Sequence, residues 1–246
     1  MKNRIKFVLQ KLLGYRNYLY IFAMYKIRTL KSDSKEKDFF QFMDEISVDG
    51  GEILDIGANV GIMTYHLSKK FPNKRILAVE PMPSNFVVLK KITEKYNLKN
   101  VELIPLAVGE NKRELDMVLP IDKKVRMQGL AHVVHESIEG LGKGDIVTVS
   151  CDTIDSIAGQ TRIAGIKMDI ENFEYFALKG AQKILMRDRP IVYLELWENE
   201  NRTNCFRLLE ELDYQAFVCH HKELVKYNPQ IHKKQNFIFK VISKTG

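Results

Sequence analysis

Short apolar runs alternate with segments of helical periodicity along most of this chain, and no other feature restricts its fold as strongly. Five runs have the length and composition of buried strands: Glu52–Ile56, Arg75–Val79, Val101–Pro105, Gly165–Asp169 and Ile191–Glu195. Helices are expected between most of these strands, at Gly61–Lys70, Ser84–Tyr96 and Tyr175–Met186. Such alternation predicts an α/β fold, in which a mostly parallel sheet carries helices on both faces.

Two departures from this alternation are expected. The stretch 107–150 is rich in glycine and holds apolar runs such as Leu115–Leu119, which predicts either hairpin-like strands or a loop-rich insertion. Because long loops often carry function, its polar residues are candidates for a lid over the substrate: Arg126, Gln128 and His132. After Phe206–Leu212, two last strands are expected at Gln215–Cys219 and Asn236–Ile242, joined by a polar segment without helical periodicity, and this closing hairpin adds one antiparallel strand.

Residues 1–46 form a basic helical extension ahead of a main domain at 47–246. The net charge of the chain is +7, but residues 1–31 hold eight Lys and Arg and no Asp or Glu, so the remainder carries −1. A nucleic-acid groove across the main domain is therefore not expected. The apolar residues Ile5, Val8, Leu9, Leu12 and Leu13 recur at helical spacing. Two interpretations stay open: this helix packs on the main domain, or residues 1–31 contact a membrane surface or a partner.

A second helical stretch is expected near Tyr18–Leu30, then a polar linker at 31–37 and a helix over 38–46. No apolar run reaches the roughly 18 residues that span a bilayer, and no signal-peptide cleavage pattern is found. The three cysteines form no CxxC pair, which favours a reducing compartment and predicts a cytoplasmic, or peripherally membrane-bound, protein. The oligomeric state is left open, a homo-oligomer included.

The segment from Ile53 to Gly61 is the most informative for function. A buried strand enters a turn with Gly57, and Gly61 opens the next helix, so that free main-chain N–H groups can face a ligand. The spacing D-x-G-x-N-x-G differs from the G-x-G-x-x-G of dinucleotide sites. Glu80 ends the following strand 19 residues after Gly61, where a carboxylate can accept both hydroxyls of a ribose. Leu106 and Ala107, after the third strand, suit a flat ring.

Several segments together resemble the FkbM family of class I methyltransferases over roughly residues 50–242. They are DIGANVG at Asp55–Gly61, VEPMPSNFVVLKKI at Val79–Ile92, AVG at Ala107–Gly109, IKMDIENFEYFALKGA at Ile166–Ala181 and PIVYLELWE at Pro190–Glu198. The resemblance implies a Rossmann-like sheet of seven strands with the last antiparallel, S-adenosylmethionine (SAM) as methyl donor, and O-methylation, often of sugar hydroxyls. The family usually has glycine where this chain has Asn172, which bears on the substrate more than on SAM.

The residues expected at the cofactor are Asp55, Ile56, Gly57, Ala58, Asn59, Gly61, Glu80, Pro81, Met82, Asn85, Leu106, Ala107 and Asp169. Asp169 is also the first candidate for the base that takes the proton of a hydroxyl acceptor, and His132 is the second. Asp169 can instead only orient the SAM amino group, and His132 can be an ordinary packed histidine. Glu171 and Glu195 are the further catalytic candidates. Glu171 either holds the turn or binds a substrate hydroxyl, and Glu195 either orients the substrate or is a structural hydrogen-bond acceptor. Lys167 is a candidate for pairing with a carboxylate.

Asp169, Glu171 and Glu195 have the oxygen ligands that suit Mg²⁺, but no ligand spacing requires a metal, and none is predicted. The leading hypothesis is a SAM-dependent O-methyltransferase for a sugar, a glycoconjugate or a related small molecule. Two alternatives remain: a methyltransferase for RNA or another nitrogen acceptor, and a SAM-binding module without catalysis. The sequence lacks the N/D-P-P-Y/F motif of amino-methylating enzymes.

Overall fold

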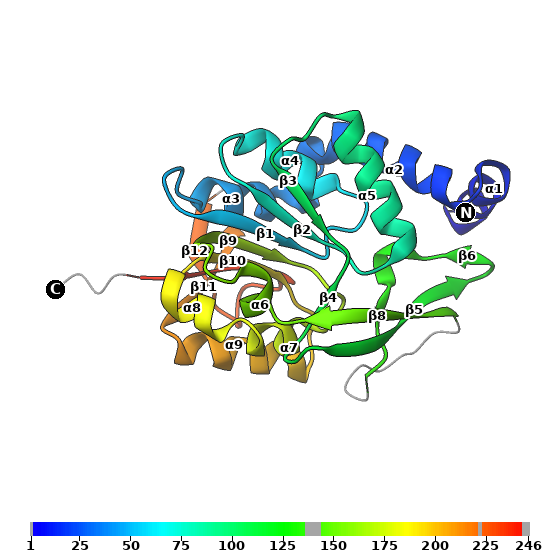
Figure 1. Ribbon diagram of the computed structural model, residues 1–246. Helices are drawn as coiled ribbons and strands as arrows, with labels where there is room; N and C mark the ends of the chain where they lie inside the picture. Colours follow the sequence, from blue (N-terminus) through cyan, green and yellow to red (C-terminus); the bar gives the residue numbers. More distant parts are fainter. Residues whose placement is uncertain (1, 136–143, 221–222, 243–246) are drawn as a thin grey trace.

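A twisted sheet of eight strands forms the centre of the protein (Figure 1). The computed structural model describes residues 2–135, 144–220 and 223–242. In spatial order the strands are β12 (Glu223–Lys226), β11 (Tyr214–His220), β13 (Asn236–Val241), β10 (Ile191–Glu195), β9 (Ile163–Met168), β1 (Glu52–Ile56), β2 (Ile76–Val79) and β3 (Val101–Ile104). Strands β3, β2, β1, β9 and β10 are parallel, and β13 is antiparallel to both of its neighbours. The predicted α/β fold with an antiparallel last strand is confirmed.

The eighth strand, β12, lies in the polar segment for which no secondary structure was predicted. It pairs with β11 in antiparallel register, so that Val225 lies opposite Val218. Only four residues long and partly exposed at the sheet edge, it has too little apolar alternation to stand out in the sequence.

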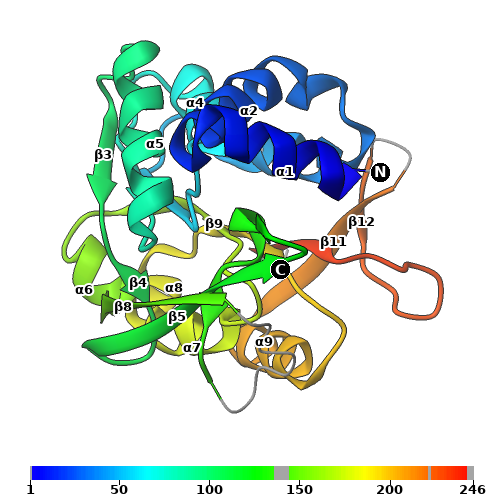
Figure 2. The same ribbon diagram turned by 90° about the vertical axis from the view of Figure 1, so that its right-hand side faces the viewer.

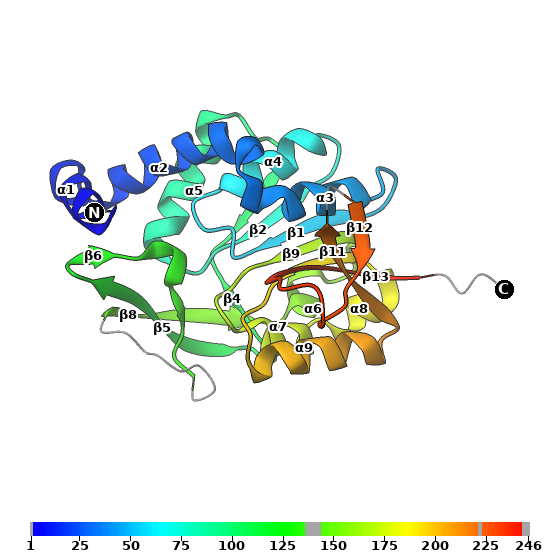
Figure 3. The same ribbon diagram turned by 180° about the vertical axis from the view of Figure 1, so that it is seen from behind.

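Helices cover both faces of the sheet (Figure 3). One face carries α2 (Tyr15–Thr29), α3 (Lys37–Glu45), α4 (Ile62–Lys70) and α5 (Pro83–Lys95). The other carries α6 (Ile154–Ala158), α7 (Glu174–Lys179), α8 (Gln182–Asp188) and α9 (Glu200–Glu211). Successive side chains of β1 point to opposite faces of the sheet. Ile53 packs in the cluster with Phe39 and Phe42 of α3. Leu54 packs in the cluster with Leu185 of α8, on the other face.

The helix predicted over 175–186 is two helices, α7 and α8. The chain turns at Gly180, between the two helices. A Cβ on Gly180 would overlap the carbonyl oxygen of Gly109, so only glycine allows the segment that contains Gly109 to lie this close to the turn. Helix α6 was not predicted. The linker predicted at 31–37 contains two short 3-10 turns, Leu30–Ser32 and Ser34–Glu36.

Residues 2–45 include three α-helices, α1 (Lys2–Leu13), α2 and α3. Helix α2 buries Leu19, Ala23 and Ile27 beside residues of α4 and α5, and α3 is part of the core under the sheet, so both belong to the main body. The division at residue 46 stays a prediction. Within the described ranges, no helix has both the length and the apolar content that crossing a membrane requires.

The stretch 107–150 contains a second, smaller sheet (Figure 2). Strands β5 (Arg113–Asp122) and β8 (Gly144–Asp152) form a long antiparallel pair, flanked by β4 (Ala107–Val108), β6 (Val125–Arg126) and β7 (His132–Val133). A 3-10 turn, Gln128–Leu130, precedes β7. Of the two forms expected for this region the structure shows the hairpin, and residues 136–143 lie outside the described part. Several of its side chains line the cavity described below.

Candidate active site

The turn after β1 approaches the neighbouring strand so closely that a side chain has no room. Gly57 has a φ of 72°, and a Cβ on it would overlap the carbonyl oxygen of Asp169. Gly61, at the start of α4, has a φ of 85°, and a Cβ there would lie 2.8 Å from Leu89 Cδ1. Both glycines therefore meet a conformational and a steric requirement. The main-chain N–H groups expected to face a ligand instead donate within the protein: those of Gly57 and Ala58 to Val79 O, and that of Asn59 to Glu80.

A buried lysine holds this turn from behind. Lys167 Nζ donates hydrogen bonds to the carbonyl oxygens of Gly57 at 2.8 Å and Ile56 at 3.2 Å, and forms an ion pair with Asp55 Oδ1 at 3.3 Å. Thr64 Oγ1 donates to the other oxygen of Asp55 at 2.6 Å. Burial alone would lower the pKa of Lys167, but the negative charges of Asp55 and Asp169 raise it above its usual value, so the ammonium form is retained. The carboxylate partner expected for Lys167 is thus Asp55.

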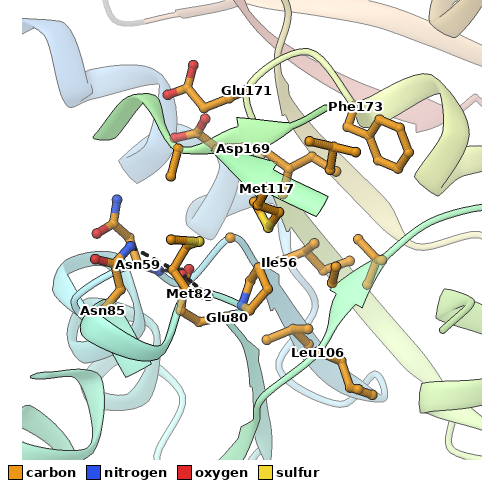
Figure 4. A pocket seen from close by; sticks show the side chains of 18 of the residues that line it. Ile56, Asn59, Glu80, Met82, Asn85, Leu106, Met117, Asp169, Glu171 and Phe173 are labelled. Atoms are coloured by element: carbon orange, nitrogen blue, oxygen red, sulfur yellow. Dashed lines mark hydrogen bonds between the residues drawn. The ribbon is translucent and has the colours of Figure 1, made fainter. Parts of the chain in front are cut away.

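Glu80 fixes the far side of the turn (Figure 4). Its carboxylate accepts hydrogen bonds from Asn59 N at 2.8 Å, Met82 N at 3.0 Å and Asn85 Nδ2 at 3.2 Å. Burial raises the pKa of Glu80 to about 7, although the hydrogen bonds act in the opposite direction. One side chain thereby joins the first turn to the start of α5.

A cavity opens between these groups and the small sheet, with about 690 Å³ of empty space when the solvent at its mouth is included. Most residues predicted at the cofactor line it: Ile56, Gly57, Asn59, Glu80, Pro81, Met82, Asn85, Leu106, Ala107 and Asp169. Three others do not. Asp55 faces Thr64 and Lys167, while Ala58 and Gly61 pack on Leu89 of α5.

Carboxyl groups gather at the opposite side of the cavity from Glu80, where Figure 4 shows Asp169 and Glu171. Burial raises the pKa of Glu171 to about 9, and the neighbouring charges of Asp169, Glu195 and Glu174 add to the effect. Burial also raises the pKa of Asp169, against the opposing charge of Lys167. Glu174, buried below, accepts a hydrogen bond from Ile170 N at 2.9 Å, and burial raises its pKa to about 8. Burial therefore makes each of these carboxyls a weaker acid than a free one.

Two of the predicted catalytic residues do not line the cavity. Ala131 and Val133, the neighbours of His132 in the chain, line the cavity, so His132 at the start of β7 points to the other side of the strand. There His132 is buried, with Nδ1 at 2.7 Å from the carbonyl oxygen of Leu130. Glu195, at the end of β10, is also outside the lining, although its pKa is raised to about 7 by burial and by the nearby charge of Asp169.

Of the three residues predicted for a lid, Gln128 lines the cavity, whereas Arg126 and His132 do not. Arg126 forms an ion pair with Asp145 at 2.9 Å, and its guanidinium lies over the ring of Tyr15 at 5.4 Å. Within residues 2–135, 144–220 and 223–242 no three His, Cys, Asp or Glu side chains are grouped as a metal site would need, so Asp169, Glu171 and Glu195 do not form the trio considered from the sequence.

Comparison with known proteins gives the same assignment as the motifs. Residues 55–242 match the methyltransferase FkbM domain, which is more than half of the chain. The chain belongs to the FkbM methyltransferase family. This family is one of SAM-dependent methyltransferases, and the match spans the main sheet and the small sheet together.

Individual relatives of this FkbM domain are distant. Methyltransferase 1 of Beauveria bassiana (strain ARSEF 2860) is 25% identical over 149 residues, which are 54% of this chain and 59% of that protein. An (S)-coclaurine N-methyltransferase of Thalictrum flavum subsp. glaucum is 25% identical over 103 residues, 41% of this chain and 28% of that protein. The crystal structure of a methyltransferase FkbM from Methylobacillus flagellatus KT superposes with a TM-score of 0.52 and 19% identity, covering 78% of this chain and 44% of that one.

The chain spans less than two thirds of the length of these relatives. The likeness to the solved structure bears on the fold alone.

Asn172, where this FkbM domain departs from the usual glycine of the family, keeps the glycine-like backbone. Its φ is 74°, in the left-handed region that asparagine tolerates better than most residues. Its side-chain oxygen accepts a hydrogen bond from Asn199 Nδ2 at 2.8 Å, and its carbonyl oxygen accepts one from Asn201 Nδ2 at 3.1 Å. The substitution therefore preserves the turn and adds an attachment to the start of α9.

Sequence reasoning missed the part of the cavity wall that the small sheet supplies: Met117, Gly129, Ala131 and Val133. It also missed Ile170 and Phe173 beside the acidic groups. A signal was present for Met117, because Leu115, Met117 and Leu119 alternate along β5 and pack in one cluster, although Val118 between them is buried as well. Which side would face the cavity depends on how the small sheet folds over the large one.

Proposed function

We propose that the chain transfers a methyl group from SAM to a hydroxyl group of a sugar, a glycoconjugate or a related small molecule. One observation carries the proposal: a single cavity has the Gly57 turn and Glu80 on one side, and the carboxyl groups of Asp169 and Glu171 on the other. The first side has the groups that an adenosyl ligand needs, and the second has groups suited to a neutral, hydroxyl-bearing acceptor.

The residues on the first side fit SAM. Gly57 itself lines the cavity, so the turn after β1 can contact a ligand there. A carboxylate has about four acceptor positions, and Glu80 uses three on protein donors, which leaves one for a ribose hydroxyl. Leu106, Ala107 and Met117 provide an apolar wall for a purine. When bound, SAM would supply an electrophilic methyl group on a positively charged sulfur.

On the second side, the protein must align the acceptor oxygen and remove its proton. Alignment within a walled cavity is mainly a proximity effect. Asp169 is the proposed base, because it lines the cavity at the end of β9 and its main chain touches the Gly57 turn. A correctly placed base typically contributes about 10²–10⁴-fold to the rate. Glu171, with its raised pKa, is proposed to donate a hydrogen bond from its protonated form to a second hydroxyl of the acceptor.

An amine acceptor is the second candidate, favoured by a specific observation. Asp169, Glu171, Glu174 and Glu195 are close enough to affect one another's pKa values, so this side of the site would attract a cation at high pH. An RNA acceptor has less support, because residues 32–246 carry a net charge of −1.

The experiment is a turnover assay with isotope-labelled SAM against glycosides, nucleosides and primary amines of similar size, read by mass spectrometry. The proposal expects labelled product with glycosides. Product with amines alone would move the assignment to N-methylation. Calorimetric binding of SAM without product on any acceptor would favour a binding module, and absence of SAM binding would refute the assignment of the cavity.

A further inference from the structure

Helix α1 is oriented with its apolar side away from the protein. Ile5, Val8, Leu9 and Leu12 occupy one side of the helix, and their side chains are 56%, 50%, 39% and 76% exposed. An amphipathic helix of a globular protein normally turns such a stripe toward the core.

The opposite side of α1 attaches the helix to the small sheet. Gln10 lies about 150° around the helix from the centre of the apolar stripe, at 3.6 residues per turn. Its side-chain amide donates to the carbonyl oxygen of Arg126 at 3.0 Å and accepts from the amide of Arg126 at 3.1 Å. Arg126 is itself held by Asp145 and lies over Tyr15 of α2. The outward direction of the stripe is therefore fixed by contacts made on the other side of the helix.

Basic residues flank the stripe. Arg4 and Lys11 lie along one border and Lys6 along the other, at helical spacing. Residues 1–31 as a whole carry eight basic residues and no acidic ones, whereas the rest of the chain is close to neutral. An apolar stripe between cationic borders complements the interface of an anionic bilayer, where apolar side chains enter the acyl boundary and cations meet lipid phosphates.

We infer that α1 is a docking surface for anionic membranes, on which it lies flat through Ile5, Val8, Leu9 and Leu12. Figure 2 looks onto α1 beside the β5–β6 hairpin, and strand β5 also supplies Met117 to the cavity wall. Docking would therefore bring this part of the enzyme to the bilayer surface. The inference is independent of the acceptor proposed above.

The test is co-sedimentation of the full chain with vesicles. Vesicles of phosphatidylcholine and phosphatidylglycerol in equal parts should bind the protein, binding should weaken as salt is raised, and phosphatidylcholine vesicles should bind much less. The double variant Ile5→Gln with Leu12→Gln should lower the partition coefficient about tenfold or more. Replacement of Arg4 and Lys11 by Gln should lower it roughly fivefold per side chain.

Ile231→Gln is the matched control, because Ile231 is 70% exposed but lies in the loop before β13, remote in sequence from α1. It should bind vesicles like the parent. The α1 variants should keep the thermal midpoint and the affinity for S-adenosylhomocysteine, so that a loss of vesicle binding is separable from a failure of the proposed function.

Equal vesicle binding by the Ile5/Leu12 variant and the parent would overturn the inference, as would an equal loss in Ile231→Gln. A third outcome also overturns it: the parent ignores anionic vesicles but forms a dimer by light scattering, and the Ile5/Leu12 variant is monomeric. The stripe would then be covered by a second copy of the chain.

Discussion

Gly57 packs against the main chain of Asp169 so tightly that a Cβ on Gly57 would overlap the Asp169 carbonyl oxygen. The amide of Asp169 also donates to the carbonyl oxygen of Ile56 at 3.2 Å, one residue before the turn. The proposed methyl-donor turn and the main chain of the proposed base are therefore in direct contact, and Lys167 donates hydrogen bonds to the carbonyl oxygens of Ile56 and Gly57. A Cβ on Gly57 should displace the main chain of Asp169, whereas a change confined to the Asp169 side chain leaves this contact in place.

Gly57→Ala should abolish measurable binding of S-adenosylhomocysteine, a loss of about 100-fold or more, because the new methyl group forces the turn away from β9. Calorimetric titration measures this. Gly159→Ala is the matched control, since Gly159 also has a positive φ, of 53°, but only Ser156 O lies near its Cβ position, at 4.0 Å. That variant should lose some stability and keep its affinity. Micromolar binding by Gly57→Ala would contradict the assignment of the turn.

Glu80→Gln should weaken S-adenosylhomocysteine by roughly 10- to 100-fold, because one carboxylate oxygen becomes an NH₂ group facing the donors Asn59 N or Met82 N. The control is Glu102→Gln on the adjacent strand β3, where Glu102 is exposed and forms an ion pair with Arg75 at 3.1 Å. Affinity equal to the parent in Glu80→Gln would remove Glu80 from the cofactor site.

The first half of the site was predictable because its signals are local. Gly57 and Gly61 are required by the backbone within a few residues, and the spacing to Glu80 is set by one helix between two adjacent strands. Asp55 was predicted at the cofactor for the same reason, whereas the structure places its carboxylate beside Thr64 and Lys167, outside the cavity lining.

The second half depends on how distant segments pack. His132 was a candidate because of its residue type, but a strand directs alternate side chains to opposite faces, and the sequence of β7 does not state which face meets the cavity. Met117 and Val133 reach the cavity only because the small sheet folds over the ends of the large one. Such packing is a tertiary property that local patterns do not encode.

Stability in the absence of ligand should fall as pH rises from about 6.5 to about 8. The pKa values of Glu174, Glu80 and Glu195 are raised to about 8, 7 and 7, from 4.5. Over this range the unfolded chain has already lost these protons and the folded chain still holds part of them, so deprotonation favours unfolding. His66, whose pKa is lowered to about 4 by burial, opposes the trend only below about pH 6.5.

Urea unfolding at the two pH values measures this slope. Glu174→Gln should reduce it, since the amide still accepts the hydrogen bond of Ile170 N but does not titrate, and the change should be on the order of 1–2 kcal/mol. A slope unchanged by Glu174→Gln would mean that Glu174 titrates normally.

Asn172→Ala should destabilise the protein by about 1–2 kcal/mol, because alanine at a φ of 74° is strained and the bond to Asn199 is lost. Asn172→Gly should cost less, since glycine adopts this backbone freely and only the side-chain bond is lost. Thermal unfolding of both variants measures the difference. Equal destabilisation would show that the attachment to Asn199, and not the backbone, decides which residue is tolerated here.

Asp169→Asn should lower kcat by about 10²–10⁴-fold while the affinity for S-adenosylhomocysteine changes much less, because a base acts only on the acceptor. Burial raises the pKa of Asp169, so kcat of the parent should rise with pH as this carboxyl ionises. The variant should not show this rise of kcat with pH. If Glu171 is the base instead, Glu171→Gln removes the activity, and kcat of the parent rises near the Glu171 pKa of about 9. Glu198→Gln, an exposed carboxyl beyond the same sheet edge, is the control and should leave kcat unchanged. A decrease in affinity as large as that in kcat would instead assign Asp169 to holding the cofactor.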